Sequence, residues 1–300
     1  MPSAGASDEG SGGRISPVDV FRAYLYAPMT FLAYRPLLFG DPARRLALGL
    51  THADEPAGLG LVELDPDGAA RLRSLYVAEA LRGRGHAAAL LEALEAAALA
   101  AERAEITAVW MAGQPSTAAV ERVLAKRGWE PPAPRMHVLR SNLESIDRAR
   151  WMTRARLAPA FETFLWKDLT AAERAAVERR QATHPVPREV YPFNVSPAIE
   201  PHTSLGVRHQ GEVVGWVVNH RYDQKTVRFT CSYLRDELQG RGRLVAVYAE
   251  SINRCRPVGI TDAIWTIPVE FRAMVAFMRR HLLPYATEAT ETRGSRKRLA

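Results

Sequence analysis

The sequence is poor in cysteine, and no uninterrupted apolar run is long enough for a membrane span. Two cysteines in 300 residues, Cys231 and Cys255, build no disulfide framework, and no Cys/His cluster has metal-site spacing. The Ala/Leu-rich stretch after Gly85 is interrupted by Glu92 and Glu95, which argues against a transmembrane helix. We therefore expect a protein of the reducing cytoplasm with no structural metal and no membrane partner.

The first residues also lack a feature, the apolar centre of a signal peptide. Residues 1–17 are rich in Gly and Ser and carry Asp8 and Glu9, so we predict a disordered tail. No Cys/His or Ser/His/Asp set stands out along the chain. This makes a covalent nucleophile of those types a poor explanation of function.

The first half of the chain has no excess of positive charge. Residues 1–150 hold 17 Lys and Arg against 18 Asp and Glu, whereas residues 151–300 hold 23 against 15. A basic half attracts an anionic partner such as nucleic acid or a phosphorylated cofactor, and plain solubility of an Arg-rich chain explains it equally well. The closing run from Arg293 to Arg298 is explained by a solvated tail at least as well as by a binding patch.

Alternating strand and helix patterns predict an α/β fold with a mixed sheet in each half. In the first half we predict strands at 46–50, 57–64, 71–77, 105–111 and 135–139, and helices from the turn after Val77 to about 102 and over 117–127. In the second half we predict strands at 161–166, 204–209, 212–221, 226–234 and 262–268, and helices over 170–181, 238–254 and 271–281.

The two halves repeat at a constant spacing of 157 residues. Gly58 matches Gly215 and Tyr76 matches Tyr233, and the Arg/Gly-rich turn after the fourth strand recurs as well. One register covers hairpin, strand, turn and helix without a gap. We therefore predict two copies of one fold, over residues 18–145 and 146–300.

The Arg/Gly-rich turn, which we call the glycine turn, has the composition of an anion-binding loop. It comprises the six residues Arg82, Gly83, Arg84, Gly85, His86 and Ala87. Glycines let the backbone approach a ligand, and the start of the following helix offers unpaired N–H groups and a positive dipole end. The arginines can add charge-assisted contacts to phosphate oxygens. A tight strand–helix turn with solvated arginines is the simpler alternative.

The glycine turn fits the pattern Arg/Gln-x-x-Gly-x-Gly/Ala and so resembles the acyl-CoA loop of the GCN5-related N-acetyltransferase (GNAT) superfamily. The segment Ala118–Trp129 resembles the family's next helix and its closing Gly-aromatic pair. In the second half, Gln239 to Leu244 is an imperfect copy, because Leu244 stands where Gly or Ala is expected. The resemblance covers nearly the whole chain and implies two tandem GNAT folds.

That resemblance implies a twisted mixed sheet in each copy, splayed between its fourth and fifth strands and flanked by helices. The co-substrate would be acetyl-CoA or another acyl-CoA. Its pantetheine arm would lie beside Leu75, Tyr76 and Val77. Its pyrophosphate would bind the backbone N–H groups of residues 83–87, with Arg82 also in the cofactor site. We favour the first copy as the working one, because its loop is intact.

The resemblance also implies direct attack of an amine on the thioester, with a base that takes the amine proton. Glu63, near the end of the third strand, is the candidate base, and His220 is its counterpart in the second copy. An exposed strand-end carboxylate and an ordinary surface histidine are the simpler explanations. The tyrosine that often protonates the leaving thiolate is replaced by Leu124, and by Phe277 in the second copy.

The leading hypothesis is an acyl-CoA-dependent N-acyltransferase acting on a primary amine of a small molecule or peptide. An acyl-carrier protein is an alternative acyl donor, and nucleic acid is not expected as a partner. An aminoacyl-tRNA-dependent transferase with tandem GNAT-like halves is a second hypothesis, which the basic second half fits. A non-catalytic acyl-CoA-binding protein is a third.

Overall fold

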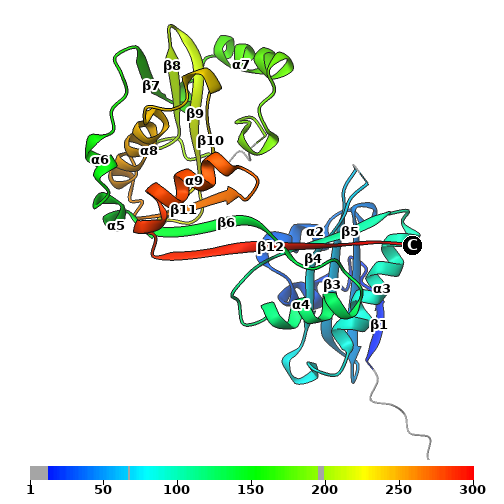
Figure 1. Cartoon of the computed structure of the whole chain (residues 1–300). Helices are drawn as coiled ribbons and strands as arrows, with labels where there is room; N and C mark the ends of the chain where they lie inside the picture. Colours follow the sequence, from blue (N-terminus) through cyan, green and yellow to red (C-terminus); the bar gives the residue numbers. More distant parts are fainter. Residues whose placement is uncertain (1–12, 67, 195–198) are drawn as a thin grey trace, which may run out of the picture. The chain divides into compact units, whose positions relative to one another are not determined.

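The computed structural model describes residues 13–66, 68–194 and 199–300, and the chain forms two compact units. Unit 1 comprises the chain up to Pro134 together with Thr292–Ala300, and unit 2 comprises Arg135–Glu291 (Figure 1). The predicted division at residue 145 stays a prediction. Within the described residues, no helix is long and apolar enough to cross a membrane.

Unit 1 contains a mixed sheet whose single parallel pair is formed by β4 and β5. In spatial order its strands are β1 (Arg14–Pro17), β2 (Arg45–His52), β3 (Glu55–Leu64), β4 (Ala70–Val77), β5 (Glu105–Met111) and β12 (Glu288–Arg298). Successive side chains of a strand point to opposite faces, so Leu61 and Val62 of β3 enter different cores. The sheet is therefore covered on both sides.

Four helices make the two covers of unit 1: α1 (Ala23–Tyr26), α2 (Arg35–Phe39), α3 (His86–Ala100) and α4 (Thr117–Lys126). Tyr26 of α1 and Leu38 of α2 pack with Leu61, and we call this side the α1–α2 face. Leu91 of α3 and Leu124 of α4 pack with Val62 on the other side, the α3–α4 face.

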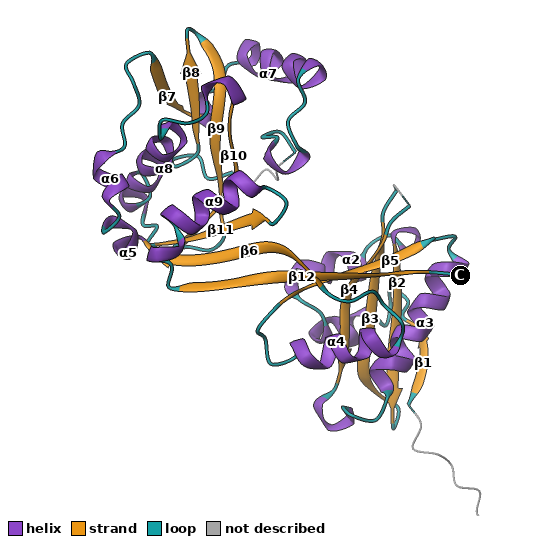
Figure 2. Cartoon of the chain, in the orientation of Figure 1, coloured by secondary structure: helices purple, strands orange, loops and turns teal. Residues whose placement is uncertain are grey.

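Unit 2 repeats this architecture. Its strands in spatial order are β6 (Ala133–Asn142), β11 (Asp262–Pro268), β10 (Thr226–Leu234), β9 (Glu212–Arg221), β8 (Leu205–His209) and β7 (Phe161–Leu165). Its helices are α5 (Leu143–Asp147), α6 (Arg150–Arg154), α7 (Ala171–Thr183), α8 (Arg243–Asn253) and α9 (Arg272–His281). Figure 2 shows α7 and α8 on opposite sides of β8–β10, each over its own hydrophobic cluster.

The predicted α/β fold with mixed sheets is confirmed, and most element bounds agree with the prediction to within a few residues. The capping box of α7 is present: Thr170 accepts from the Glu173 N–H, and the Glu173 carboxylate accepts from the Thr170 N–H. A hydrogen bond from Arg208 is the main reason that the pKa of Glu173 falls to about 2.

The structure differs from the prediction in two terminal segments. Residues 14–17, predicted as the end of a disordered tail, form β1 and pair antiparallel with β2, whereas residues 1–12 lie outside the described residues. The run from Arg293 to Arg298, for which a solvated tail was at least as good an explanation as a binding patch, belongs to β12 and pairs antiparallel with β5. In both cases an available strand edge, which local composition does not reveal, orders the segment.

The repeat of 157 residues is present in the backbone. A Cβ at Gly58 would lie 2.8 Å from the Tyr76 carbonyl oxygen, and one at Gly215 would lie 2.7 Å from that of Tyr233. The register also shifts at matched places, so that Arg73 in β4 and Thr230 in β10 each lie in a β-bulge. Two copies of one fold therefore underlie the chain.

Candidate functional site

The strands β4 and β5 part at the bulge, since their last pair precedes Arg73. β5 pairs with β4 only from Ala70 to Leu72, although β3 pairs with β4 along its whole length. The next residues of β4, 74–77, have no β5 partner among the described residues. The backbone of Leu75, Tyr76 and Val77 therefore borders an opening in the sheet, where the sequence places the acyl-CoA arm.

The glycine turn lies where β4 leads into α3. Gly83 has φ 80° and Gly85 has φ 87°, a left-handed conformation that only glycine adopts readily, and Gly85 is the N-cap of α3. No side chain caps this helix end. A Cβ at either glycine would meet no described atom within 4 Å, so the approach to the turn is open. The first N–H groups of α3 can thus receive an anion.

The side chains of the glycine turn divide into anchors and exposed groups. The Arg82 Nε donates to the Val77 carbonyl oxygen at 3.1 Å, which ties the turn to the end of β4. Ala87 is partly buried and packs on a small cluster with Val77 and Leu81. Arg82 and Arg84 are both exposed, and His86 is partly buried. The two arginines can therefore meet an anion, Arg84 with its whole guanidinium and Arg82 with its terminal nitrogens.

The candidate base, Glu63, lies in an ion pair on the α1–α2 face. Its Oε2 accepts from the Arg73 Nε at 2.8 Å and lies 2.6 Å from an Arg73 Nη. The Arg73 guanidinium also lies over the Tyr34 ring, 5.5 Å from its centroid. Both Glu63–Arg73 contacts use Oε2, so Oε1 is left to accept from a water or an amine. The sequence offered Glu63 but not its partner, because the bulge decides which β4 side chain reaches it.

A second pair of polar groups joins the α1–α2 segment to β4 beside the bulge. The Thr30 and Ser74 hydroxyls lie 2.5 Å apart, and both residues are buried. This bond holds residues 27–34 over the part of β4 that borders the opening. Neither residue was singled out from the sequence, because their 44-residue separation leaves no local signal.

The position of the missing tyrosine is part of the core. Leu124 is 1% exposed and packs with Leu91 and Val62 on the α3–α4 face. The Trp129 of the Gly-aromatic pair is also buried, and its Nε1 donates to Glu95 at 2.7 Å. The α4 segment therefore supplies packing at these two positions and no proton donor from Leu124.

The turn of unit 2 repeats the left-handed glycines of the glycine turn and differs at Arg241, whose φ is also positive, 51°. Gly240 has φ 86° and Gly242 has φ 70°, and the Gln239 side chain donates to the Leu234 carbonyl oxygen at 2.9 Å, as Arg82 does to Val77. The Leu244 side chain packs against the hydrophobic core of unit 2. The core of unit 2 therefore accommodates the leucine at the position where the motif has Gly or Ala.

The counterpart of the Glu63–Arg73 pair in unit 2 is His220 and Thr230, whose Nδ1 and Oγ1 lie 2.7 Å apart. Beside them, burial raises the pKa of the Cys231 thiol to about 12, and its Sγ donates to the Val190 carbonyl oxygen. A thiol of that pKa is a poor nucleophile at neutral pH. Across the described residues, no group of three His, Cys, Asp or Glu side chains could hold a metal ion.

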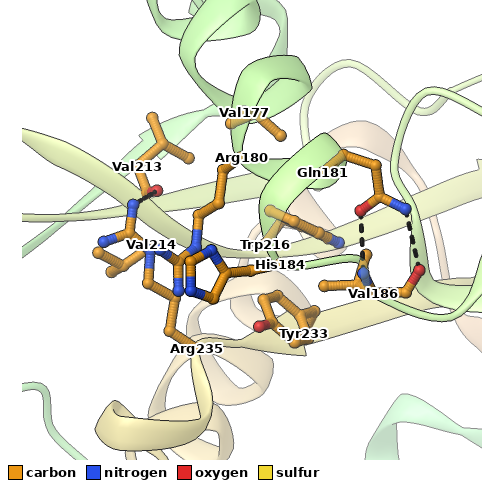
Figure 3. Close-up of a pocket in the computed structure, with 10 residues that line it drawn as sticks. All are labelled: Val177, Arg180, Gln181, His184, Val186, Val213, Val214, Trp216, Tyr233 and Arg235. Atoms are coloured by element: carbon orange, nitrogen blue, oxygen red, sulfur yellow. Dashed lines mark hydrogen bonds between the residues drawn. The ribbon is translucent and has the colours of Figure 1, made fainter.

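A small pocket, with a volume of about 20 Å³, lies in unit 2 between α7 and the strands β9 and β10. Figure 3 shows Trp216 and Tyr233 on its strand side and Arg180, Gln181 and His184 on its helix side. Gln181 is fixed by two hydrogen bonds to the Val186 backbone. The pocket has no counterpart in the sequence prediction.

Comparisons with known proteins agree with this geometry. Residues 17–129 match the model of the acetyltransferase (GNAT) family. A tandem GNAT protein from the clavulanic acid biosynthesis pathway, solved without acetyl-CoA, has TM-score 0.68 and 14% identity, covering 96% of this chain and 99% of that one. A GCN5-related N-acetyltransferase from Sphaerobacter thermophilus has TM-score 0.66 and 15% identity, covering 96% of each chain. No curated protein sequence matches the chain.

The family model covers residues 17–129, which lie in unit 1, and the likeness to solved structures over nearly the whole chain shows a tandem GNAT fold. The predicted resemblance and the tandem GNAT fold are thereby confirmed. The acceptor, the acyl group and the site residues belong to the proposal that follows.

Proposed function

We propose that the protein transfers an acyl group, acetyl by default, from an acyl-CoA thioester to a primary amine of a small molecule or peptide. One observation carries this proposal: the open N–H groups at the start of α3 lie next to the unpaired edge of β4. An anion-binding helix start and a free strand edge are what a diphosphate and an amide-containing arm each need. Both occur in unit 1, within a dozen residues of each other.

The binding roles follow from this arrangement. The arm would run along β4 at Leu75, Tyr76 and Val77 and pair with those of their N–H and C=O groups that point away from β3. The diphosphate would accept hydrogen bonds from the N–H groups of residues 83–87. Arg84, and Arg82 through its terminal nitrogens, would add charge-assisted contacts from the surface. His86 would support the turn rather than supply most of the binding.

The chemical step would use Glu63 on the α1–α2 face. Acyl-CoA supplies a thioester carbon that an amine can attack and a thiolate that can leave. Glu63 Oε1 would take the proton of the attacking amine, directly or through a water, while Arg73 holds Oε2 in place. A C–N bond forms and the C–S bond breaks, and solvent protonates the thiolate, because Leu124 carries no proton to donate.

The experiment measures release of coenzyme A from acetyl-CoA with a panel of primary amines. We expect turnover with at least one amine, and a fall in kcat of about 10²-fold or more for Glu63→Gln with unchanged acetyl-CoA binding. Glu55→Gln, at the exposed opposite end of β3, is the matched control and should keep its activity. Tight acetyl-CoA binding without release for any amine would instead establish a non-catalytic acyl-CoA-binding protein.

A further inference from the structure

The two units differ most where their central strands part. The last parallel pair before the opening is Leu72 with Ala108 in unit 1 and Phe229 with Trp265 in unit 2. These positions correspond through the repeat of 157 residues. An aliphatic pair in one unit is thus replaced by two aromatic rings in the other.

The aromatic replacement continues from the sheet onto the two helices that cover it. Tyr248 of α8 stands where unit 1 has Leu91, and Phe277 of α9 packs against Tyr248. On β10, Ser232 stands where unit 1 has Leu75. We call the set of Phe229, Trp265, Tyr248, Phe277 and Ser232 the aromatic row.

The aromatic row is a continuous stack from β11 to α9. The ring centroids of Trp265 and Phe229 lie 5.1 Å apart with the planes at 12°. Tyr248 follows at 5.3 Å from Phe229, and Phe277 at 5.5 Å from Tyr248. Such distances are those of favourable aromatic pairs, so the stack fills the space between the strands and the helices with well-packed side chains.

A hydrogen bond closes the row on the side of the glycine-containing turn. The Tyr248 hydroxyl lies 2.7 Å from the Ser232 Oγ, which links α8 directly to β10. Tyr248 is 2% exposed, and burial raises its pKa to about 12. In unit 1 the counterpart of Ser232 is Leu75, a hydrophobic residue whose side chain can form no such hydrogen bond.

We propose that the aromatic row closes the arm slot of unit 2, so that the chain binds a single acyl-CoA, in unit 1. This inference rests on the proposed function, because it assumes that acyl-CoA binds in the opening between β4 and β5. Both turns have left-handed glycines with open surroundings, although Arg241 is left-handed too and Leu244 stands in place of Ala87. The inference therefore rests on the slot, where aromatic rings replace Leu72, Ala108 and Leu91.

Isothermal titration of the full chain with coenzyme A tests the inference. We expect one molecule per chain for the wild type, no detectable binding for Gly85→Trp, and one molecule for Gly242→Trp. The two variants are matched, because both glycines are helix N-caps with positive φ and open surroundings. Circular dichroism checks that each variant is folded.

Two molecules per wild-type chain would overturn the inference and leave the proposed function standing. Binding that survives Gly85→Trp and disappears in Gly242→Trp would overturn it as well. If Gly85→Trp does not fold, the stoichiometry of the wild type and of Gly242→Trp still shows whether coenzyme A binds in unit 1 alone. One bound molecule without turnover for any amine would remove the proposed function but not the inference.

Discussion

Glu95 lies on α3 and is the most heavily engaged carboxylate of unit 1. It accepts from the Trp129 Nε1 at 2.7 Å, from an Arg127 Nη at 2.9 Å and from the Lys297 Nζ at 2.6 Å. Burial alone raises the pKa of this carboxyl, but the three hydrogen bonds outweigh burial and hold its pKa below the ordinary value. The ionised form is therefore the one that stabilises the fold.

Glu95→Gln should lower the free energy of unfolding by about 1–2 kcal/mol at neutral pH, because the partly exposed Arg127 and Lys297 lose a buried carboxylate partner. The folded pKa of Glu95 lies below the unfolded value of about 4.3. Its stabilisation is thus complete above that unfolded value and is lost as the pH falls through the lower folded value. Urea unfolding at several pH values should show the wild type and the variant converging in acid.

Glu92→Gln provides the matched control on the same helix. Glu92 is exposed and pairs only with Arg127, at 3.2 Å, so its loss should change stability by about 0.5 kcal/mol or less. A Glu95→Gln protein as stable as the Glu92→Gln protein at neutral pH would show that the three contacts of Glu95 do not hold unit 1 together.

The candidate cofactor residues are easier to propose from the sequence than the candidate base. The glycine turn is contiguous, so its residue types and its place between strand and helix are visible without the fold. The ion pair of Glu63 with Arg73 is different, because it depends on a β-bulge that shifts the register of β4 by one residue. No local pattern in residues 70–77 announces that shift.

The helices and most strands followed from the sequence because their signals are local. The strand β5 was predicted at its observed bounds, and the cap of α7 depends on two residues three positions apart. Local sequence does not show which strand pairs with which. The strand after α4 pairs with β11, and the strand at the end of the chain pairs with β5, a choice made by contacts between residues far apart in sequence.

Removal of residues 292–300 should destabilise unit 1 more than unit 2. The deletion takes the ladder partner from β5, the donor Lys297 from Glu95, and Leu299 from the α3–α4 core. We expect hydrogen exchange of the β5 amides to rise roughly tenfold or more, because their opening no longer requires breaking a ladder. Mass spectrometry of exchanged peptides measures this.

The deletion of Ala300 alone is the comparison for that experiment, since Ala300 is exposed and lies beyond β12. Its β5 peptides should exchange as in the wild type. Equal protection of β5 in the wild type and in the chain without residues 292–300 would mean that β12 contributes no stability to unit 1.

The two units share one backbone arrangement and differ in the side chains that lie where their central strands part. Both have a bulged central strand, a parting of the parallel pair, and a helix that begins at a left-handed glycine. Unit 1 keeps aliphatic side chains at the opening, and unit 2 has the aromatic row. The repeat could be predicted from matched glycines, but the filling could not, because an aromatic residue in a strand is equally typical of an ordinary core.

Amide hydrogen exchange with and without coenzyme A tests the central claim, which is that the start of α3 binds the diphosphate of an acyl-CoA. The account predicts new protection of the N–H groups of residues 83–87 and of β4 at residues 75–77, with no change at residues 240–244. Protection confined to residues 240–244, or none in either turn at saturating coenzyme A, would contradict it.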